Sequence, residues 1–283
     1  MADITAIILT RNEEKNIARC LDSISALCRR MVVVDSGSTD QTVALAKAHG
    51  AQVYYHEFEY YARQFNWGLD NCDISTKWVI RIDADEQFPP QLCREIEQAI
   101  AAHDSDDING LTLEATYIFL GKPLTHGAKK RKLMVFKYGL GRIEDRRRDA
   151  HTILSCGQSL SLKEHFLHHD FKDLDSFIGR YNWYATREAM DYMDWKRGQN
   201  DAHVDDAKIQ HKRNRKYGLY YRFPKYFRAL LWFNVNYFLK GGFLDGKEGL
   251  IYHVLSSFWY RFIVDAKIHE YEQGKEYEPL KAY

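Results

Sequence analysis

Short apolar runs alternate with amphipathic stretches along the first hundred residues of the chain. The runs are rich in β-branched and aromatic residues, as in strands buried on both faces, and they cover residues 4–10, 31–35, 52–55 and 78–82. Helices are predicted between and after them, at residues 17–27, 42–48, 61–69 and 91–101. This alternation predicts an α/β fold with a mostly parallel, twisted sheet and right-handed crossovers.

Polar residues follow three of these runs at the points where the predicted strands end. They are Thr10 with Arg11, Asp35 with Ser36, and the segment from Asp83 to Asp85. Ligands of parallel α/β sheets bind at the carboxyl ends of the strands. We therefore expect these three groups to share one crevice.

The acidic segment after the fourth run carries Asp83, Asp85 and Glu86 within four residues. The Asp-X-Asp spacing places two hard oxygen donors on the same side of an extended chain, where they can hold Mg²⁺ or Mn²⁺ while substrate phosphates fill the other positions. Glu86 suits a support for the turn. The alternative is an acidic loop that caps the next helix, because Pro89 and Pro90 precede a helical pattern.

The end of the second run is informative for nucleotide chemistry. A carboxylate such as Asp35 can accept hydrogen bonds from the N–H of a uracil or from ribose hydroxyls, although Asp35 and Ser36 can also simply begin a turn. Neither a Gly-X-Gly-X-X-Gly fingerprint nor a Gly-Lys-Ser/Thr loop is present. Dinucleotide-binding and P-loop functions are therefore disfavoured.

The middle of the chain combines a predicted strand at 109–119, a basic run at 129–132 and an amphipathic, core-facing helix at 174–192. The basic run is either a solvated face or a contact for a donor pyrophosphate or an anionic acceptor. The segment 141–152 is rich in charge. Its acids are candidates for a catalytic base, or else they neutralise the neighbouring arginines: Glu144, Asp145 and Asp149.

The composition is that of a globular protein, with 283 residues, 45% of them hydrophobic and 14% aromatic, and a net charge of +1. The five cysteines are scattered and include no Cys-X-X-Cys pair, so neither a disulfide framework nor a zinc site is predicted and a reducing cytosol is expected. We expect no secretory signal, because no basic region followed by a long apolar one opens the chain. No run reaches the roughly 18–20 apolar residues of a spanning helix.

The C-terminal third has a different character. Residues 208–228 contain eight Lys or Arg and no Asp or Glu, interleaved with aromatic residues. The following segment, 230–239, is too apolar for a nucleic-acid groove and too short to span a bilayer, but it suits a helix lying among anionic headgroups. A helix packed in the protein core is the alternative.

Taken together, the polar blocks at residues 8–17, 33–40 and 81–86 resemble the nucleotide-sugar domain of family 2 glycosyltransferases of the GT-A fold. These blocks cover roughly the first third of the chain. A glycine-rich block at 240–249, followed by Trp-Tyr-Arg-Phe at 259–262, resembles the ends of surface-polysaccharide members of the family. The Gln-X-X-Arg-Trp element of processive synthases is absent, which favours the transfer of a single sugar.

The resemblance implies a role for individual residues. The residues implied to bind the nucleotide are Thr10, Arg11, Glu13, Asp35, Ser36, Arg63 and Asp83. Asp85 is implied to bind Mg²⁺ or Mn²⁺, with Asp83 and His169 as further contributors. Many relatives carry Tyr at the position of Arg11, so the base would be stacked either by a ring or by a guanidinium.

Related enzymes often read Asp-Glu-His where this chain has Asp149-Ala150-His151. The match favours Asp149 as the catalytic base, with Glu144 and Asp145 as the other candidates. Because the acid expected at position 150 is absent, a catalytically degenerate relative that acts as a membrane-bound scaffold for glycan assembly is the alternative function. A sugar nucleotidylyltransferase is disfavoured, because the glycine-rich loop expected after the first strand is missing.

The predicted organisation is a GT-A domain over residues 1–205, with a nucleotide-binding part at 1–105 and an acceptor part at 106–205, followed by a helical, membrane-associating extension at 206–283. The predicted activity is inverting, metal-dependent transfer of one sugar from a nucleoside diphosphate sugar, UDP above all, to a hydroxyl of a lipid-linked or surface glycan. The predicted location is the cytoplasm, at the inner face of the cytoplasmic membrane, without nucleic-acid binding.

Overall fold

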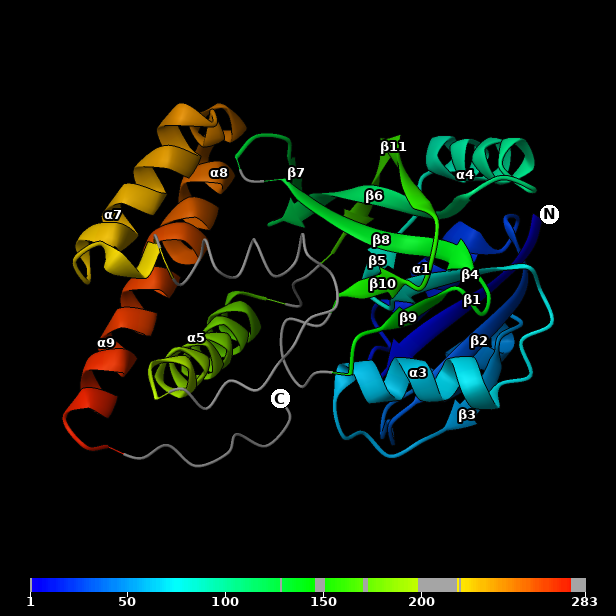
Figure 1. Ribbon diagram of the computed structural model, residues 1–283, viewed down its shortest axis with the longest axis horizontal. Coiled ribbons are helices and arrows are strands. Elements are labelled where there is room, and N and C mark those ends of the chain that lie inside the picture. Colours follow the sequence, from blue (N-terminus) through cyan, green and yellow to red (C-terminus); the bar gives the residue numbers. More distant parts are fainter. Residues whose placement is uncertain are drawn as a thin grey trace. The chain divides into compact units, whose positions relative to one another are not determined.

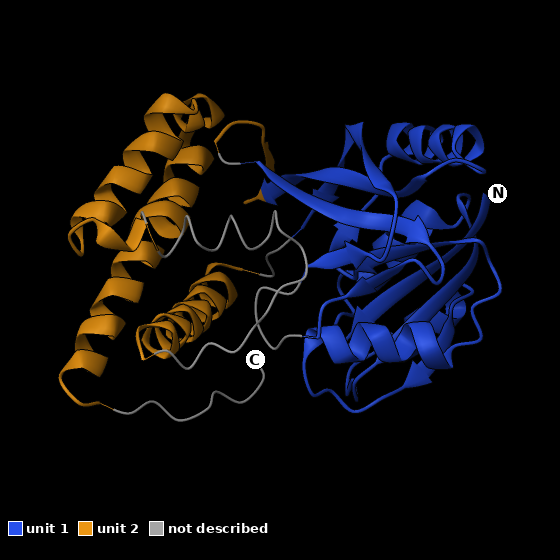
Figure 2. Ribbon diagram, in the orientation of Figure 1, with its two compact units in different colours: residues 1–118, 129–170 blue, residues 119–128, 171–283 orange. Residues whose placement is uncertain are grey.

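The computed structural model describes residues 2–127, 129–145, 151–169, 173–197, 218 and 220–275. The chain forms two compact units, residues 1–118 with 129–170 and residues 119–128 with 171–283 (Figure 2). The domain boundary expected at residue 205 lies outside the described residues. The helix predicted near residues 174–192 belongs to the second unit.

The first unit is built on a mixed sheet with helices on its faces (Figure 1). Its helices are α1 (Ile17–Ile24), α2 (Thr42–Ala48), α3 (Tyr61–Asn71) and α4 (Pro90–Ala102). Its strands are β1 (Ala2–Thr10), β2 (Cys28–Asp35), β3 (Gln52–Tyr55), β4 (Trp78–Asp83), β5 (Glu86–Gln87), β6 (Ile108–Phe119), β8 (Lys130–Lys137), β9 (Gly141–Ile143), β10 (Thr152–Leu154) and β11 (Gln158–His168). Each strand and helix predicted in the first hundred residues is confirmed, with small shifts at the ends.

The main sheet has the strand order β3-β2-β1-β4-β8-β6-β11-β5. The pairs among β3, β2, β1 and β4 are parallel, and so is the pair of β6 with β11. Strand β8 runs antiparallel to both β4 and β6, and β5 runs antiparallel to β11. The sheet is therefore parallel in its N-terminal half and mixed beyond β4. Strands β9 and β10 form a separate antiparallel pair.

The parallel half is covered on both faces, as its apolar runs predict. Ile7, Val34 and Phe65 belong to one buried cluster beneath α3, and the alternate residue Ile8 is fully buried on the other face. Gly68 brings α3 close to the sheet, because a Cβ at this position would lie 3.1 Å from Val34 Cγ2 and 3.2 Å from Ile7 Cγ2. The first residue of this closely packed helix, Tyr61, contacts Asp83 at the end of β4.

The second unit is mainly helical. It comprises β7 (Lys122–Leu124), α5 (Leu174–Lys196), η1 (Tyr220–Arg222), α7 (Phe227–Asn234), the π-helical η2 (Val235–Leu239), η3 (Gly242–Asp245), α8 (Gly246–His253), the π-helical η4 (Val254–Trp259) and α9 (Tyr260–Glu272). Among the described residues, no helix is long and apolar enough to cross a membrane.

Helix α5 packs on α9 through small and branched side chains. Ala185 and Ala189 of α5 lie in one buried cluster with Val264 and Ile268 of α9. Helix α5 starts at Asp173, whose Oδ1 accepts a hydrogen bond from the Ser176 N–H at 2.7 Å. The core stripe predicted for this helix is confirmed on one face only.

The apolar spacing of this segment also assigns Ile178 and Tyr184 to the core stripe, and for these two residues the prediction is wrong. Ile178 and Tyr184 are 38% and 42% exposed, so they are not core residues. Each adjoins a buried position, Phe177 and Ala185 respectively, and a one-residue step turns a helical side chain by about 100°. The buried face is therefore narrower than the apolar pattern suggested.

Gly141 of β9 provides a test of the core packing in the first unit. A Cβ at position 141 would lie 2.4 Å from Cδ2 of the fully buried Phe136 ring. We expect Gly141→Ala to lower the free energy of unfolding by about 1–3 kcal/mol through overpacking, measured by urea denaturation. Adding Phe136→Leu should recover part of the loss. Additive effects of the two substitutions would show that the ring and the new methyl group do not meet.

Candidate active site

Three parallel strands place polar residues at one edge of the sheet. Thr10 at the end of β1 pairs with Asp35 at the end of β2, and Leu9 pairs with Asp83 at the end of β4. The strand ends therefore lie at one edge of the sheet, and the expectation that they share a crevice stays a prediction. Ser36 adjoins Thr10, because its N–H donates to the Thr10 carbonyl at 3.1 Å.

Asp35 organises the loop that follows β2. Its carboxylate accepts hydrogen bonds from the N–H groups of Gly37 and Ser38, each at 2.9 Å, and from the hydroxyls of Thr10 at 3.2 Å and Ser38. A carboxylate has about four such acceptor positions. Four protein donors therefore already surround Asp35, and its predicted contact with a nucleotide base stays a prediction.

Asn12 joins the loops after β1 and β2 and was missed as a site residue. It adopts the left-handed conformation with φ 56°, its Oδ1 accepts from the Thr39 N–H at 2.8 Å, and its own N–H donates to Ser38 Oγ at 2.9 Å. The Glu13 N–H donates to Thr42 Oγ1 at 2.7 Å, which adds a second link. Asparagine tolerates positive φ better than most residues, so an Asn directly after a predicted strand could have indicated a turn at this position. Arg11 is exposed on the same loop.

Asp83 is held in place by side chains from other elements. Its Oδ1 accepts from the Tyr61 hydroxyl at 2.5 Å, and its Oδ2 lies 3.4 Å from Lys132 Nζ. The Arg81 guanidinium donates to the same Tyr61 hydroxyl at 2.9 Å. Burial raises the pKa of Tyr61, so this residue remains a neutral donor to Asp83 at physiological pH. No pattern in the sequence connects Tyr61 or Lys132 with Asp83.

Glu86 is the buried counterpart of Lys132. Its side chain is 1% exposed, its Oε1 lies 2.6 Å from Lys132 Nζ, and its Oε2 accepts from the Asp83 N–H at 2.9 Å. Burial opposes ionisation, but Lys132 and His168 outweigh it and lower the pKa of Glu86 to about 2. Burial likewise disfavours the ammonium of Lys132, yet Glu86 and Asp83 raise its pKa well above the ordinary value. The predicted role of Glu86 in the turn agrees with these contacts.

Asp85 follows at the rim of the sheet. Its carboxylate lies 3.8 Å from His168 Nδ1, and its carbonyl accepts from the His169 N–H at 2.8 Å. The His169 ring nitrogen Nε2 lies 3.0 Å from Gln87 Oε1. Burial, with Arg19 and His168 adding to it, lowers the pKa of His169 to about 4, so the imidazole is neutral at physiological pH.

The carboxylates at this rim suit a hard divalent cation. Within the part of the chain that the structure describes, no group of three or more His, Cys, Asp or Glu side chains is arranged to hold a metal ion. The residues instead fit Mg²⁺ or Mn²⁺ in the mode in which one or two carboxylates share the ion with substrate phosphates. Asp85 is the most suitable ligand, because Asp83 is already engaged by Tyr61 and Lys132.

The remaining members of the basic run lie elsewhere. Lys129 and Arg131 pair with the buried Glu114 at 2.8 and 2.9 Å, and Lys130 lies over the Tyr117 ring at 5.0 Å from its centroid. Lys132 is thus the member of the run that reaches Asp83 and Glu86. Alternation along β8 separates Lys132 from Arg131, because neighbouring side chains point to opposite faces, whereas Lys130 shares the face of Lys132 but lies two residues farther along the strand.

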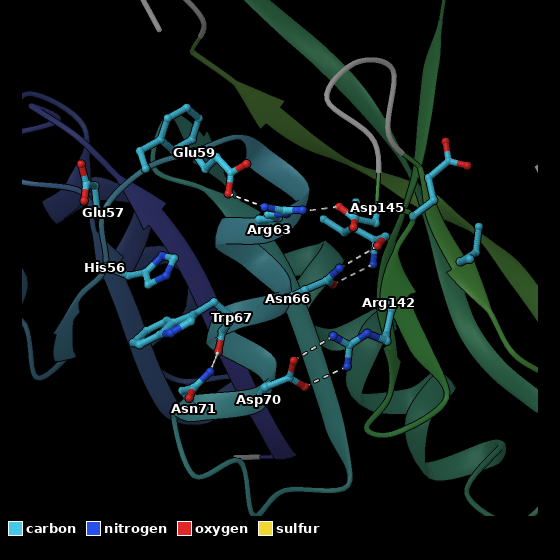
Figure 3. A pocket seen from close by; sticks show the side chains of 14 residues that line it. His56, Glu57, Glu59, Arg63, Asn66, Trp67, Asp70, Asn71, Arg142 and Asp145 are labelled. Atoms are coloured by element: carbon cyan, nitrogen blue, oxygen red, sulfur yellow. Dashed lines mark hydrogen bonds and ion pairs between the residues drawn. The ribbon is translucent and has the colours of Figure 1, made fainter. Parts of the chain in front are cut away.

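Two of the three base candidates line a groove beside α3 (Figure 3). Glu144 and Asp145 follow β9 and share this groove, of about 830 Å³, with Arg63 of α3. The Tyr60 hydroxyl donates to Asp145, and Arg63 Nε lies 3.8 Å from the same carboxylate. The predicted base Asp149 and the neighbouring Ala150 lie outside the described residues.

A family model described as glycosyl transferase family 2 matches residues 5–166, more than half of the chain. The chain belongs to glycosyl transferase family 2. The matched span contains all the strand-end residues described above.

Two relatives of this glycosyltransferase match along nearly its whole length. The lipopolysaccharide core biosynthesis glycosyltransferase LpsC of Rhizobium meliloti is 29% identical over 276 residues, which cover 94% of this chain and 92% of that protein. An uncharacterized glycosyltransferase of Rickettsia typhi is 24% identical, over 95% of this chain and 88% of that protein. Among solved structures, glucosyl-3-phosphoglycerate synthase from Mycobacterium tuberculosis, in a complex with Mn²⁺ and UDP, matches with a TM-score of 0.33 and 25% identity over 40% of this chain and 43% of that one.

The contact between Glu86 and Lys132 can be tested by removing one partner. We expect Glu86→Ala to lower the free energy of unfolding by about 3 kcal/mol at pH 7, because it removes the nearer partner of a partly buried ammonium and leaves only the longer contact with Asp83 at 3.4 Å. Glu164→Gln, at an exposed carboxylate of β11, is the control and should change stability little. The wild-type advantage over Glu86→Ala should hold above the ordinary Glu pKa of about 4.3 and fade as the pH falls toward 2. An advantage that persisted at pH 2 would contradict the charge pairing.

Proposed function

We propose that this glycosyltransferase transfers a single sugar from a nucleoside diphosphate sugar, with UDP favoured, to a hydroxyl of a lipid-linked or surface-glycan acceptor, with inversion. The observation that carries the proposal is the alignment of Thr10, Asp35 and Asp83 at one sheet edge, with Asp85 directly beyond it. Nucleotides bind at this edge of parallel α/β sheets.

Each strand-end residue has a distinct proposed part in donor binding. The two loops tied by Asn12 would form the nucleoside pocket, with Thr10, Arg11, Glu13 and Ser36 along it. Asp83, fixed by Tyr61, would face the ribose and the phosphates. Lys132 and Arg81 place positive charge beside the acidic turn, which offsets the negative charge of the carboxylates there.

Asp85, with Asp83 and a neutral His169 nearby, would hold Mg²⁺ or Mn²⁺ against the diphosphate. A bound divalent cation would supply compensation for the charge that develops on the departing nucleoside diphosphate. The acceptor hydroxyl needs a base on the opposite side of the sugar carbon. Asp149 remains the proposed base, with Glu144 and Asp145 as alternatives.

Asp85→Ala tests the metal role directly. We expect the variant to keep its unfolding midpoint and to lose the Mn²⁺-dependent thermal stabilisation by UDP or a UDP-sugar, together with at least about 100-fold of its transfer rate. Asp22→Asn, at an exposed carboxylate of α1, is the matched control and should behave as wild type. Full activity of Asp85→Ala in the presence of a chelator would refute the metal assignment. Nucleotide-sugar binding without turnover on any acceptor extract would favour the scaffold alternative.

The acceptor part of the proposal draws on an apolar ridge in the second unit. The turn that joins η2 to α8 exposes Leu239 by 81% and Leu244 by 60%, with Phe238 and Phe243 beside them. Further exposed apolar residues continue along α7, α8 and η4: Leu230, Leu231, Leu250, Ile251 and Val254. Large apolar side chains exposed on neighbouring elements are typical of an interaction site.

The ridge is held rigidly although it faces solvent. Asp245 at its base accepts hydrogen bonds from the N–H groups of Thr125 and His126 at 3.1 and 3.0 Å. The Gly127 N–H donates to the Lys240 carbonyl at 3.0 Å. Exposed Lys240 and Lys247 flank the apolar tip. A fixed apolar tip beside cations suits an anionic bilayer surface, where a lipid-linked acceptor would be presented at the cytoplasmic face.

Two leucines of the ridge provide the test. We expect Leu239→Ser with Leu244→Ser to weaken sedimentation with phosphatidylglycerol-containing vesicles by roughly tenfold per leucine, given about 1.5 kcal/mol for burying each side chain. Tyr55→Ser, at a 68% exposed residue of β3, is the control and should partition as wild type. Binding of the wild type should fall as salt is raised. Equal partition of the double variant and the wild type would refute the membrane surface.

A further inference from the structure

The groove beside α3 has walls from three segments of the first unit. Residues 56–59 follow β3, α3 contributes the helical wall, and β9 with the residues after it forms the facing wall (Figure 3). The walls are tied together by Arg142 and Asp70, whose two hydrogen bonds are each 2.8 Å, and by paired amide contacts between Asn66 and Ile143 at 2.8 and 3.1 Å. The groove is therefore preformed, and its volume of about 830 Å³ is in the range of small-molecule sites.

The charge of the groove is opposite to what a phosphorylated ligand requires. Among the residues that the structure describes, five carboxylates and two guanidiniums line it: Glu57, Glu59, Asp70, Glu144 and Asp145 against Arg63 and Arg142. Each guanidinium is already paired with one of these carboxylates, Arg63 with Glu59 and Arg142 with Asp70. A nucleoside diphosphate or a sugar phosphate would meet excess negative charge here.

The same lining suits a neutral, hydroxyl-rich ligand. Carboxylates accept hydrogen bonds from hydroxyls, and a guanidinium has five N–H donors for ring and hydroxyl oxygens. Trp67, stacked on His56 with ring centroids 4.4 Å apart, gives an aromatic surface at one end, and Phe58, Ile143 and Ile153 add apolar contacts. A pyranose has both kinds of surface, with hydroxyls at its rim and C–H groups on its faces.

The groove is linked to the strand-end site through the start of α3. Tyr60 donates its hydroxyl to Asp145 at the groove, and the next residue, Tyr61, donates to Asp83 at the end of β4. Two adjacent residues thus connect the acids of the groove with the proposed donor site. A ligand in the groove would have one end beside Glu144 and Asp145, the two alternative bases that the structure describes.

We propose that this groove is the acceptor subsite and binds an unphosphorylated sugar of the acceptor glycan, with Trp67 and Asp70 as recognition residues. The proposal rests on the proposed function, because it names the chemical class of the second substrate. It assigns selectivity to charge: phosphate-free saccharide units enter the groove, and phosphorylated ones are rejected.

The test uses neutral methyl glycosides of glucose, galactose and N-acetylglucosamine, with glucose 1-phosphate as the anionic counterpart. The readout is the indole N–H signal of Trp67 in ¹⁵N-labelled full-length protein, assigned with the Trp67→Phe variant. We expect at least one neutral glycoside to shift this signal with millimolar affinity, and glucose 1-phosphate to bind at least about tenfold more weakly. Asp70→Asn should weaken glycoside binding by about tenfold, whereas Glu164→Gln should leave it unchanged.

The outcomes of these titrations distinguish failure of the acceptor subsite from failure of the proposed function. If no neutral glycoside moves the Trp67 signal up to its solubility limit, or if glucose 1-phosphate binds as tightly, the acceptor subsite is refuted. If Asp70→Asn and Glu164→Gln bind the glycoside equally, the assignment to this groove is refuted. Thermal stabilisation by UDP with Mn²⁺ is measured on the same samples. Glycoside binding without any nucleotide response would support a saccharide site and refute the proposed transfer, and the reverse pattern would refute the subsite alone.

Discussion

The buried ion pair between Glu86 and Lys132 is the interaction on which the candidate active site depends. It lies where β4 ends, and it lets the acids of residues 83–86 remain close together without mutual repulsion deforming the turn. A pair of this kind contributes little net stability compared with apolar packing, but losing one partner is costly. The pair therefore restrains the geometry of the turn more than it stabilises the fold. The same Glu86 carboxylate also accepts a hydrogen bond from the backbone N–H of Asp83.

The two halves of the sheet supply complementary parts of the site. The parallel half, β3 to β4, aligns the strand ends and their polar residues at one edge. The mixed half brings Lys132 on β8 and His168 on β11 to the acids of β4 and β5. The acidic edge and its counter-charges thus come from distant parts of the chain. Helix α3 completes the arrangement, since Tyr60 and Tyr61 at its start contact acids on opposite sides.

The second unit differs from the first because it holds several large apolar side chains in contact with solvent. Its interior is fixed by close packing of α5 on α9 and by the buried pair of Arg228 with Asp265, both nearly inaccessible to solvent. The ridge around Leu239 and Leu244 lies on a turn that Asp245 connects to the backbone N–H groups of Thr125 and His126. A rigid apolar surface loses little conformational entropy on binding, which suits it to reversible attachment.

The sequence by itself determined the parallel half of the sheet in the first unit and the edge at which the acids lie. Runs that are apolar on both faces can only be central strands, and alternation with helices makes them parallel, so Thr10, Asp35 and Asp83 had to end together. The family blocks then indicated the chemistry. These features are local in the chain, and local patterns can be read without knowing what packs against what.

Only the tertiary structure decided the partners of those acids. The tertiary structure pairs Lys132 with Glu86, places Tyr61 against Asp83 and forms a groove between α3 and β9. These contacts depend on strand order and helix placement, because the residues that meet lie tens of positions apart in the chain. A run of four basic residues gives no indication of which one turns inward. The exposed face of the segment 230–239 was equally undetermined, because the same apolar pattern serves a core helix and a surface ridge. The free energy of pairing and burial is set by neighbours in space, and the sequence pattern does not specify those neighbours.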